Sequence, residues 1–600
     1  MTITYNLERI DMKTNTLKHM TFFKSTSTVI ITILLSSISF GQTKTEQLDD
    51  LIGKYYDYGK FNGSVLVADK SGVIYKKGFG LANMEWDMPN TSTTKHRLGS
   101  VSKQFTAMLI LQLVQAGKLD LQQPISTYLP DYPKESGATI TTHHLLTHTS
   151  GIPNYTAREG FAKDVSRNYY TPTEFIKTFN TLELDFVPGD HFSYSNSGYF
   201  LLGVIIEKLM GKTYEQALED HIFKPLKMVN SGYDNHEDIL KERATGYGKN
   251  GRDFLNADFL DMSIPYAAGS LYSTVEDLYL WDQGLYTNLL LSKELMAKYF
   301  TPFVPAFGDS KYAYGWGVGK EPIGNSTDSL EVIKHGGGIN GFNTIISRSI
   351  VDKSLVVLLN NTGGAPLNEM AQAIRGIMNG TTYDLPKQSL AYAVLNVIKK
   401  DGMDAGLSHF KANKNSELFS FYESEMNDVG YQLMGEGMVK EAATVFELII
   451  SEFPKSANAY DSYAEALMNL KDTNGAIKNY RIAIEMNPAN TAAIEQLKKL
   501  GDDTSDLEKE ITVANSILET YVGEYALAPK FILTITKVGN QLKTQATGQG
   551  VFDVFPTSDT EFYLKVVDAK IKFNLNKKGE VESLTLFQGG QEMEAKRVEE

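Results

Sequence analysis

The sequence RLGSVSKQF, residues 97–105, places a serine and a lysine three positions apart, Ser100 and Lys103. Apolar residues recur at helical spacing from Phe105 onward, so the stretch predicts the start of a buried helix with both side chains on one face. A serine hydroxyl becomes a nucleophile when a neighbouring base takes its proton, and a desolvated lysine with a lowered pKa can act as that base. The same spacing recurs at two other pairs, Ser92/Lys95 and Ser408/Lys411. The spacing alone therefore does not identify a catalytic pair.

The length and composition of the chain restrict its class. Its 600 residues exceed what one hydrophobic core can organise and predict a folded protein of several domains. The net charge of -14 argues against a surface that binds nucleic acid or anionic membranes, so neither is expected as a partner. Cysteine is absent, which excludes disulfide bonds, thiolate metal ligands, cysteine nucleophiles and a lipid attached through cysteine.

The first 42 residues have the pattern of a secretory signal peptide. Lysines precede a short apolar run, residues 29–38, and the small residues Ser39 and Gly41 follow it. The run is too short to span a bilayer as a permanent helix, and an uncleaved anchor is the alternative interpretation. We therefore expect an exported protein, periplasmic or secreted, without a stable membrane span after signal cleavage.

Two further stretches place polar residues next to apolar segments. Tyr194 and Asn196 stand in a turn just before a strongly apolar helix predicted over residues 200–210. Upstream of them, His144 and His148 have the i, i+4 spacing of zinc ligands. A zinc protease would need a glutamate beside the first histidine and a third ligand, and neither is evident. A structural loop is therefore the preferred interpretation, and no metal is expected.

A glycine-rich stretch begins at His335 and continues through Gly336, Gly337 and Gly338. Two strands are predicted directly after it, within residues 342–360. Glycines beside a strand let a ligand approach the backbone and leave amide hydrogens free for hydrogen bonding. A phosphate-binding loop is the alternative interpretation, but the lysine, the Ser/Thr and the helix that such a loop requires are missing.

Three motifs occur in one order along the chain: Ser100-x-x-Lys103, Tyr194-Ser195-Asn196 and His335-Gly336-Gly337. Their order and surroundings resemble the serine β-lactamase and penicillin-binding protein family, in its class C branch with D-Ala-D-Ala carboxypeptidases and related esterases. The resemblance covers roughly residues 45–380, and four further stretches support it: residues 145–151, 188–203, 223–228 and 267–277. Any single motif is weak, but the motifs in register are specific.

The resemblance implies a fold and a mechanism for residues 43–385. The fold is an α+β domain of the β-lactamase/transpeptidase type, with an antiparallel sheet packed between helices. Ser100 would attack a carbonyl and form an acyl-enzyme, while Lys103 and Tyr194 would transfer protons, Tyr194 with a phenol pKa lowered by Lys103. The residues expected to bind substrate are Asn196, His335, Gly336, Gly337 and Gly338, with Asn196 bonded to Lys103 or to the substrate amide. The backbone amides of Ser100 and Gly338 would form the oxyanion hole, and neither a metal nor an organic cofactor is required.

One motif departs from the family pattern. Where β-lactamases and penicillin-binding proteins usually carry Lys-Thr-Gly, this chain has His335-Gly336-Gly337, so a histidine that is mostly neutral at pH 7 replaces a permanent ammonium. Esterases and peptidases of the broader family carry this form. Strong β-lactamase activity is therefore not expected, whereas serine hydrolysis is. If neutral His335 orients the substrate, kcat/KM rises with pH through roughly 6 to 7.

Residues 386–505 show helical periodicity that repeats at 34 residues. Shifting the sequence by one repeat pairs Leu433 with Leu467 and Pro454 with Pro488, which is the length and pattern of tetratricopeptide (TPR) repeats. An earlier helix pair would stack as a degenerate first unit. This all-α segment is expected either to bind a peptide or protein partner in its groove or to serve as a spacer.

Residues 515–600 alternate between apolar and polar side chains in short segments separated by turns, which predicts an all-β barrel or sandwich. With Tyr521 and Tyr525 at its start, the segment resembles the lipocalin-like domain often appended to this hydrolase family. Such a domain either binds a ligand or is filled by side chains as a structural accessory.

The combined prediction is a multidomain, exported serine hydrolase that cleaves an ester or amide in a small-molecule or peptide substrate. D-amino-acid peptides, esters and β-lactam-like compounds are the expected substrate classes. The alternative is a catalytically weak or inactive protein that binds a peptide or partner through the hydrolase cleft and the TPR groove. Retention of Ser100, Lys103, Tyr194 and Asn196 together argues for the enzyme.

Overall fold

The structure of the chain is a computed structural model. It describes residues 42–250, 253–507, 511–528, 531–547, 549–567, 569–588 and 591–598. The signal peptide expected over residues 1–42 lies outside the described residues except for Gln42. None of the helices in these ranges combines the length and the apolar composition needed to cross a membrane.

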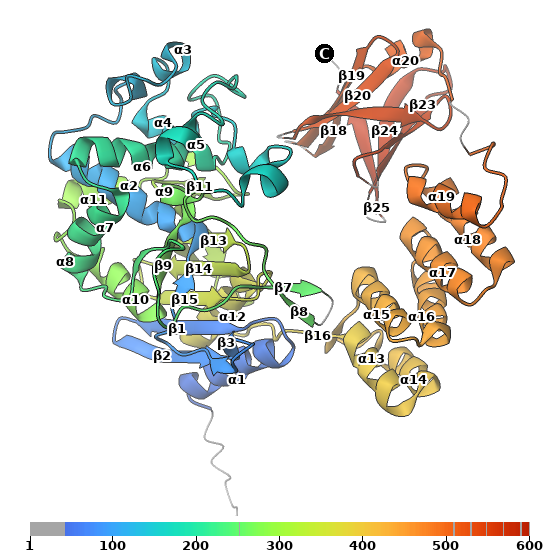
Figure 1. Ribbon diagram of the computed structural model, residues 1–600, viewed down its shortest axis with the longest axis horizontal. Coiled ribbons are helices and arrows are strands. Elements are labelled where there is room, and N and C mark those ends of the chain that lie inside the picture. The colour runs from blue at the N-terminus through green and yellow to red at the C-terminus, as the bar shows by residue number, and fades with distance from the viewer. Residues whose placement is uncertain are drawn as a thin grey trace, which may run out of the picture. The chain divides into compact units, whose positions relative to one another are not determined.

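An eight-stranded antiparallel sheet organises the N-terminal part of the chain (Figure 1). Its strands, in order across the sheet, are β10 (Val304–Pro305), β11 (Lys311–Tyr312), β12 (Gly317–Pro322), β13 (Ser329–Ile339), β14 (Phe342–Arg348), β15 (Leu355–Asn360), β1 (Gly63–Asp69) and β2 (Gly72–Phe79). The two strands predicted after the glycine-rich stretch are confirmed as β14 and β15.

The centre of the sheet is buried on both faces. Because successive side chains of a strand point to opposite faces, neighbouring residues of one strand pack into different cores. Val65 and Val67 of β1 pack with the helices α1 (Lys44–Asp57) and α12 (Leu367–Asn379), whereas Leu66 of the same strand packs on the opposite side. This alternation explains the continuous apolar run in β1. It confirms the predicted antiparallel sheet packed between helices.

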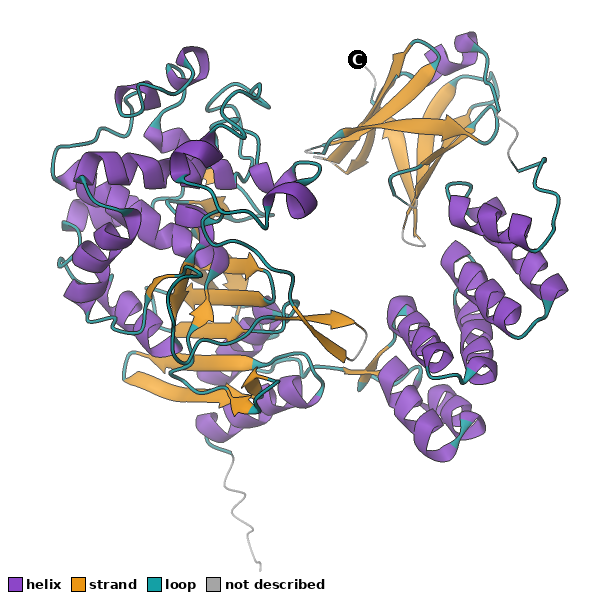
Figure 2. Ribbon diagram, in the orientation of Figure 1, coloured by secondary structure: helices purple, strands orange, loops and turns teal. Residues whose placement is uncertain are grey.

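The second face of the sheet is covered by helices that form the larger core (Figure 2). These helices are α2 (Ser102–Gln115), α6 (Asn196–Met210), α9 (Tyr266–Gly269), α10 (Val275–Gly284) and α11 (Lys293–Tyr299). The helix predicted after Ser100 is α2, and a 3-10 turn, η1 (Gly99–Val101), carries Ser100 directly into it. The helix predicted over residues 200–210 is the C-terminal part of α6, and it ends at Gly211 in a left-handed conformation (φ 67°).

Short elements connect these layers. The helical turns are η2 (Ile125–Thr127), α3 (Lys134–Gly137), α4 (Thr142–Leu146), η3 (Tyr155–Ala157), η4 (Phe161–Val165), α5 (Pro172–Ile176), α7 (Tyr214–Leu218), η5 (Glu219–Phe223) and α8 (Lys224–Leu226). The short strands are β3 (Leu81–Asn83), β4 (Met88–Pro89), β5 (His96–Arg97), β6 (Gly232–Tyr233), β7 (Tyr247–Asn250), β8 (Asp253–Asn256) and β9 (Leu271–Ser273). Strand β5 pairs with β9, which places the turn before Ser100 next to the chain that follows α9.

Helices follow one another through residues 390–499. They are α13 (Leu390–Asp401), α14 (Met403–Asn413), α15 (Glu423–Gly435), α16 (Val439–Glu452), α17 (Ala457–Asn469), α18 (Thr473–Met486) and α19 (Thr491–Lys499). Two short strands, β16 (Gln388–Ser389) and β17 (Phe419–Ser420), pair in parallel within this region. The helices α15, α17 and α19 begin 34 residues apart.

The C-terminal part forms a closed eight-stranded barrel, so the barrel predicted as one of two alternatives is confirmed. Its elements are α20 (Asn515–Tyr521), β18 (Gly523–Ala528), β19 (Phe531–Val538), β20 (Gln541–Ala546), β21 (Val551–Pro556), β22 (Glu561–Leu564), β23 (Ala569–Leu575), β24 (Val581–Gln588) and β25 (Gln591–Arg597). Side chains fill its interior, where the rings of Tyr521 and Phe573 stack with centroids 3.9 Å apart.

Candidate active site

Ser100 and Lys103 meet at the start of α2. The Lys103 ammonium lies 3.0 Å from Ser100 Oγ, and it also donates to Asn196 Oδ1 at 2.8 Å and to the Ala268 carbonyl at 2.8 Å. The lysine side chain is fully buried, and this desolvation lowers its pKa well below the usual 10.5. A neutral lysine amine that donates its two hydrogens to fixed acceptors has its lone pair left to accept the proton of the serine hydroxyl.

Glycine at position 99 allows the serine turn to approach strand β13. Gly99 has a positive φ of 55°, and a Cβ atom there would lie 2.9 Å from the backbone nitrogen and oxygen of Gly338. A side chain would therefore separate the two backbone segments. The close approach brings the backbone next to Ser100 beside Gly338, the two positions whose amides the sequence predicts as an oxyanion hole.

Tyr194 lies across from the serine, just before α6. Its side chain lies near Ser100, and Lys103 Nζ lies 4.9 Å from the centre of the Tyr194 ring. Burial raises the pKa of Tyr194, and the nearby Ser100 hydroxyl only partly opposes that rise. The expected lowering of the Tyr194 pKa by Lys103 is therefore wrong. The physical reason is that burial lowers the pKa of Lys103 as well, so the lysine supplies little positive charge to stabilise a phenolate.

Asn196, the first residue of α6, is oriented by contacts on both ends of its amide. Its Oδ1 accepts from Lys103, and its Nδ2 donates to Asn154 Oδ1 at 3.3 Å. The backbone amide of Asn196 also donates to Asn154 Oδ1, at 3.1 Å. The side chain lines the cleft and holds one hydrogen of the lysine amine in place.

His335 is turned away from the substrate space. Only 8% exposed, it lines a separate depression together with Tyr312 and Gly336 instead of the cleft at Ser100. Its Nδ1 bonds to the Gly336 carbonyl at 2.6 Å and its Nε2 to the Tyr312 hydroxyl at 2.9 Å, so both ring nitrogens are occupied within the protein. Burial, with a smaller contribution from Lys103, lowers its pKa to about 4. The pH dependence expected through 6 to 7 therefore does not come from this histidine, which is already neutral there.

The three glycines after His335 differ in their surroundings. A Cβ at Gly337 would lie 1.9 Å from the Leu98 carbonyl oxygen, so this glycine lets β13 pack against the chain before Ser100. Gly338 lines the cleft and has open space where a Cβ would be. Gly336 lines the same depression as His335. The structure thus brings only Gly338 of the predicted glycines to the cleft beside Ser100.

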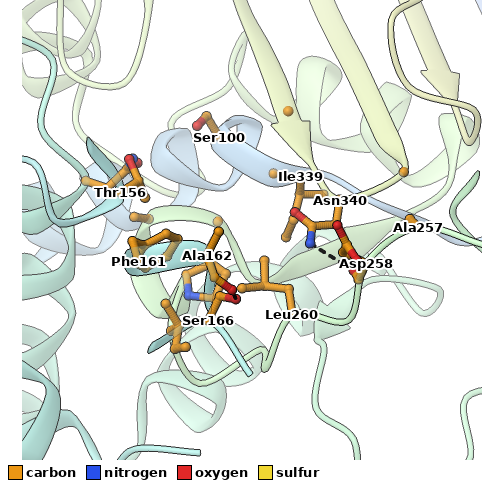
Figure 3. A pocket seen from close by; sticks show the side chains of 18 of the residues that line it. Ser100, Thr156, Phe161, Ala162, Ser166, Ala257, Asp258, Leu260, Ile339 and Asn340 are labelled. Carbon is orange, nitrogen blue, oxygen red and sulfur yellow. Dashed lines mark hydrogen bonds between the residues drawn. The ribbon is translucent and has the colours of Figure 1, made fainter. Parts of the chain in front are cut away.

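The cleft at Ser100 has a volume of about 600 Å³. Figure 3 shows Phe161 and Ala162 across from Ile339 and Asn340, with Ser100 at one end. Its charged lining residues are Arg167 and Asp258, whose side chains form an ion pair at 3.3 Å and are largely exposed. Asn340, in the turn between β13 and β14, donates to the Asp258 carbonyl at 2.8 Å and holds this wall in place.

Sequence reasoning missed several residues that line this cleft, namely Phe161, Arg167, Asp258, Leu260 and Asn340. They lie in short elements and loops without periodicity or a recognisable motif, so the sequence carried no signal that would have brought them together. The two spaced histidines, by contrast, follow the structural interpretation. His144 Nδ1 accepts from the Thr141 amide, and His148 Nδ1 accepts from the Ser195 amide.

Comparisons with known proteins separate two regions of the chain. The profile of a family described as Beta-lactamase matches residues 48–378. A second profile, described as "Domain of unknown function (DUF3471)", matches residues 507–597.

Individual relatives match more than half of the chain. PbpX of Bacillus subtilis (strain 168), named as a penicillin-binding protein, is 32% identical over 339 residues, covering 56% of this chain and 80% of PbpX. The teichoic acid D-alanine hydrolase of Staphylococcus aureus (strain NCTC 8325 / PS 47) is 29% identical over 351 residues, covering 58% of this chain and 80% of that protein. Among solved structures, a penicillin-binding protein from Bacillus halodurans is 28% identical with a TM-score of 0.48, covering 55% of this chain and 98% of that one.

Proposed function

The chain belongs to the beta-lactamase family and is a serine hydrolase of that family, and from this premise we propose that Ser100 is its nucleophile and that it cleaves D-aminoacyl esters or amides. The observation that carries the proposal is the set of contacts at Lys103, whose amine is held between Ser100 Oγ, Asn196 Oδ1 and the Ala268 carbonyl. Such an arrangement serves a nucleophile and its base.

Lys103 is the base in the acylation step. When its amine is neutral, its two hydrogens are donated to Asn196 and to Ala268, and its lone pair points to the Ser100 hydroxyl. Ser100 transfers its proton to this lone pair as its oxygen attacks the substrate carbonyl. The amides of Ser100 and Gly338 stabilise the oxyanion, an interaction whose loss typically costs about 2.7 to 4 kcal/mol.

Tyr194 is the acid in the same step. Because burial raises its pKa, the phenol keeps its proton at neutral pH and can donate that proton to the departing alcohol or amine. Lys103 then returns the serine proton to the tyrosine, so the protons balance when the acyl-enzyme is formed. In the second half of the reaction a water molecule attacks the acyl carbonyl while Lys103 accepts the water proton. As the bond between the acyl carbon and Ser100 Oγ breaks, Lys103 returns this proton to Ser100 Oγ, so the acid product leaves and both side chains regain their starting states.

Two observations support the substrate class. One relative of the chain, 29% identical over 351 residues, is named a teichoic acid D-alanine hydrolase. In addition, position 335 of β13 presents no cation to a substrate carboxylate, because His335 is buried and neutral. An ester or amide without a carboxylate next to the scissile bond suits this wall better than a penicillin does.

The test compares wild type with Ser100→Ala by intact-protein mass spectrometry and turnover assays. The probes are p-nitrophenyl acetate, a penicillin, and the p-nitroanilides of D-alanine and L-alanine as a matched pair. We expect a Ser100-dependent acyl adduct from the acetate, faster release from the D than from the L isomer, and little or no stable penicilloyl adduct. Absence of any Ser100-dependent adduct or turnover would overturn the proposal and favour a non-catalytic protein that binds a peptide or partner through the cleft and the helical repeats.

The remaining regions are proposed as accessory modules of this hydrolase. The 34-residue spacing of α15, α17 and α19 supports TPR repeats within residues 386–505, with a peptide or protein as partner. The filled interior of the barrel supports a structural, lipocalin-like accessory over residues 515–600 rather than a ligand carrier. Limited proteolysis tests the boundaries of the hydrolase domain, residues 43–385, and of both modules. Cuts are expected near residues 385 and 510.

Export is proposed on the pattern of the first 42 residues alone. A periplasmic or secreted location follows from signal cleavage. Expression of the full chain in a bacterial host, followed by N-terminal sequencing of the mature protein, tests this proposal. A new N-terminus near Gln42 is the expected result, and a protein that keeps Met1 or an internal start in the cytoplasm would contradict it.

A further inference from the structure

His148 adopts a backbone conformation that non-glycine residues rarely take. Its φ is 56°, in the left-handed region, and the residue is 1% exposed. Such a conformation costs free energy and persists where surrounding contacts enforce it. The contacts of His148 therefore indicate what the strained conformation achieves.

Two of these contacts bracket Tyr194. The His148 carbonyl accepts from the Ser193 amide at 2.8 Å, and His148 Nδ1 accepts from the Ser195 amide at 3.1 Å. The two donors are the residues on either side of the tyrosine. A residue with a negative φ at position 148 would direct its carbonyl and side chain differently, so both bonds depend on the left-handed conformation.

The His148 ring also packs on the tyrosine itself. The ring centroids of His148 and Tyr194 lie 4.2 Å apart with an interplanar angle of 32°, and Tyr199 packs on His148 at 4.9 Å. The Tyr194 ring is therefore held by a face contact in addition to the two backbone bonds. Lys103 lies 4.9 Å from the same tyrosine ring, so a rotation of the ring would change its distance to the base.

Hydrogen bonding defines the proton positions along a chain of three side chains. Because His148 Nδ1 accepts an amide hydrogen, a neutral His148 carries its proton on Nε2 and donates it to the Tyr312 hydroxyl at 3.2 Å. Tyr312 in turn donates to His335 Nε2 at 2.9 Å, and His335 Nδ1 donates to the Gly336 carbonyl. Burial and the neighbouring Lys103 and His335 lower the pKa of His148, which keeps its ring neutral.

We propose that His148 is a positioning residue that holds Tyr194 against Ser100 and Lys103, and that Tyr312 and His335 hold His148 in turn. The inference rests on the proposed function, because it assigns His148 a role through the proposed acid Tyr194. The proposal also assigns a role to the histidine that stands in β13 where the family pattern has a lysine. His335 supports Tyr194 through Tyr312 and His148 and does not bind the substrate.

The first experiment compares His148→Gly with His148→Asn in turnover of p-nitrophenyl acetate. Glycine adopts the left-handed conformation freely but removes the ring, whereas asparagine tolerates that conformation and places Oδ1 where Nδ1 stood. We expect His148→Gly to lower kcat by about 10- to 100-fold with little change in KM, a smaller loss than the 10²- to 10⁴-fold that removing a general acid itself typically causes. His148→Asn is expected to recover most of the loss.

A double-mutant cycle separates positioning from packing. If His148 acts through Tyr194, then His148→Gly adds little further loss in a Tyr194→Phe background, because the hydroxyl it positions is already absent. Losses that multiply in the double variant would overturn the proposal, since a packing role is independent of the tyrosine hydroxyl. An unchanged kcat in His148→Gly would overturn it as well.

The tautomers of the histidines in the wild-type protein provide a test that does not depend on turnover. Nitrogen-15 NMR at pH 7 distinguishes the two neutral tautomers of histidine, with the His148 signal identified through its loss in His148→Asn. We expect the Nε2-protonated form for His148 and the Nδ1-protonated form for His335. The opposite tautomer at His148 would overturn the proposal. Absence of Ser100-dependent turnover with the expected tautomers would overturn the proposed function and leave His148 with only a structural role.

Discussion

The two walls of the cleft at Ser100 are built in different ways. The helical wall, formed by the starts of α2 and α6, carries Ser100, Lys103 and Asn196 in a connected set of hydrogen bonds. The strand wall, at the end of β13, presents backbone at Gly338, while the side chain of His335 is directed into the protein. The proposed nucleophile and base thus lie at the start of a helix, and substrate contact on the other wall is left to the backbone and to loops.

This difference assigns proton transfer to the helical wall and substrate binding to the strand wall and the loops. Desolvation shifts the pKa of Lys103 and of Tyr194 in the directions that a neutral base and a protonated acid need. The strand wall carries no permanent charge at the position where relatives with Lys-Thr-Gly have one. Changes on the helical wall should therefore affect kcat most strongly, and changes on the strand wall should affect substrate choice or the fold.

The largest expected effect is that of Lys103→Met. Removing the base should lower kcat for p-nitrophenyl acetate by about 10²- to 10⁴-fold, the contribution typical of general acid–base catalysis. Lys411→Met, at the exposed lysine of another Ser-x-x-Lys spacing, is the matched control and should keep full activity. A Lys103→Met protein with wild-type turnover would show that the helical wall does not supply the base.

The same variant should also change the pH dependence of stability. Because the folded pKa of Lys103 is lowered, the unfolded chain binds more protons between that pKa and 10.5, and the unfolding free energy of wild type rises with pH in this window. Lys103→Met should remove this contribution. Urea titrations at pH 7, 8 and 9 measure the slope, and an identical slope in both proteins would contradict the lowered pKa.

The next effect contrasts two adjacent glycines of the strand wall. Gly337→Ala should destabilise the fold by about 1 to 3 kcal/mol or more, because its Cβ would overlap the Leu98 carbonyl oxygen. Gly338→Ala has open space for a Cβ, so it should fold normally and lower only kcat/KM by placing a methyl group in the cleft. Thermal unfolding together with ester kinetics checks the pair, and equal stability of both variants would contradict the packing of β13 against Leu98.

A third prediction concerns His335→Gln. Folded His335 has a pKa of about 4 against an ordinary 6.5, so the unfolded state binds the extra proton and the unfolding free energy falls as pH drops from 6.5 to 4. The variant should lose this part of the acid sensitivity, on the order of 3 kcal/mol at pH 4. Between pH 6 and 7, kcat/KM should have the same pH dependence in both proteins. If the wild-type kcat/KM changed with pH in this range and that of the variant did not, His335 would take part in substrate binding.

His191→Gln is the matched control for this measurement, because the His191 side chain is largely exposed and lies next to Asp190 on the surface. It should leave the acid sensitivity of the protein nearly unchanged. A comparable change in both variants would show that the acid sensitivity does not arise from the buried histidine.

The smallest expected effect is on substrate choice at the cleft mouth. Arg167 and Asp258 are exposed partners, so Arg167→Gln should hardly change stability. It should reduce kcat/KM for an ester with an anionic leaving group by about 5-fold, which corresponds to roughly 1 kcal/mol, and leave a matched neutral ester unaffected. Asp258→Asn should favour the anionic ester. Equal effects of Arg167→Gln on both esters would show that this arginine does not recognise the charge of the leaving group.

Regular patterns made much of the fold predictable. The apolar runs of β1 and α6 and the 34-residue period of α15 and α17 each reflect a local geometry that repeats along the chain. Strand β25 carries no such pattern, because most of its residues are charged or polar and only Ala595 is fully buried. A strand at such a position is recognisable only once its neighbour β24 is in place.

The candidate site was predictable where a motif holds it and not where a loop does. Ser100 and Lys103 are adjacent through one helical turn, so their proximity follows from spacing alone. Arg167 and Asp258 are far apart in sequence and meet only through the folding of two loops. The inward orientation of His335 depends on the hydroxyl of Tyr312, a residue that no motif connects to it.

By itself, the sequence predicted the main strands and helices of the hydrolase region, because these depend on short-range periodicity. The order of its three motifs pointed to Ser100 and Lys103, which we propose as nucleophile and base. Only the tertiary structure decided the protonation states and the direction of each side chain. Burial changes the pKa of Lys103, Tyr194 and His335, and burial is a property of the packed core rather than of neighbouring residues. The strained His148 beside Tyr194 is likewise visible only in the folded chain.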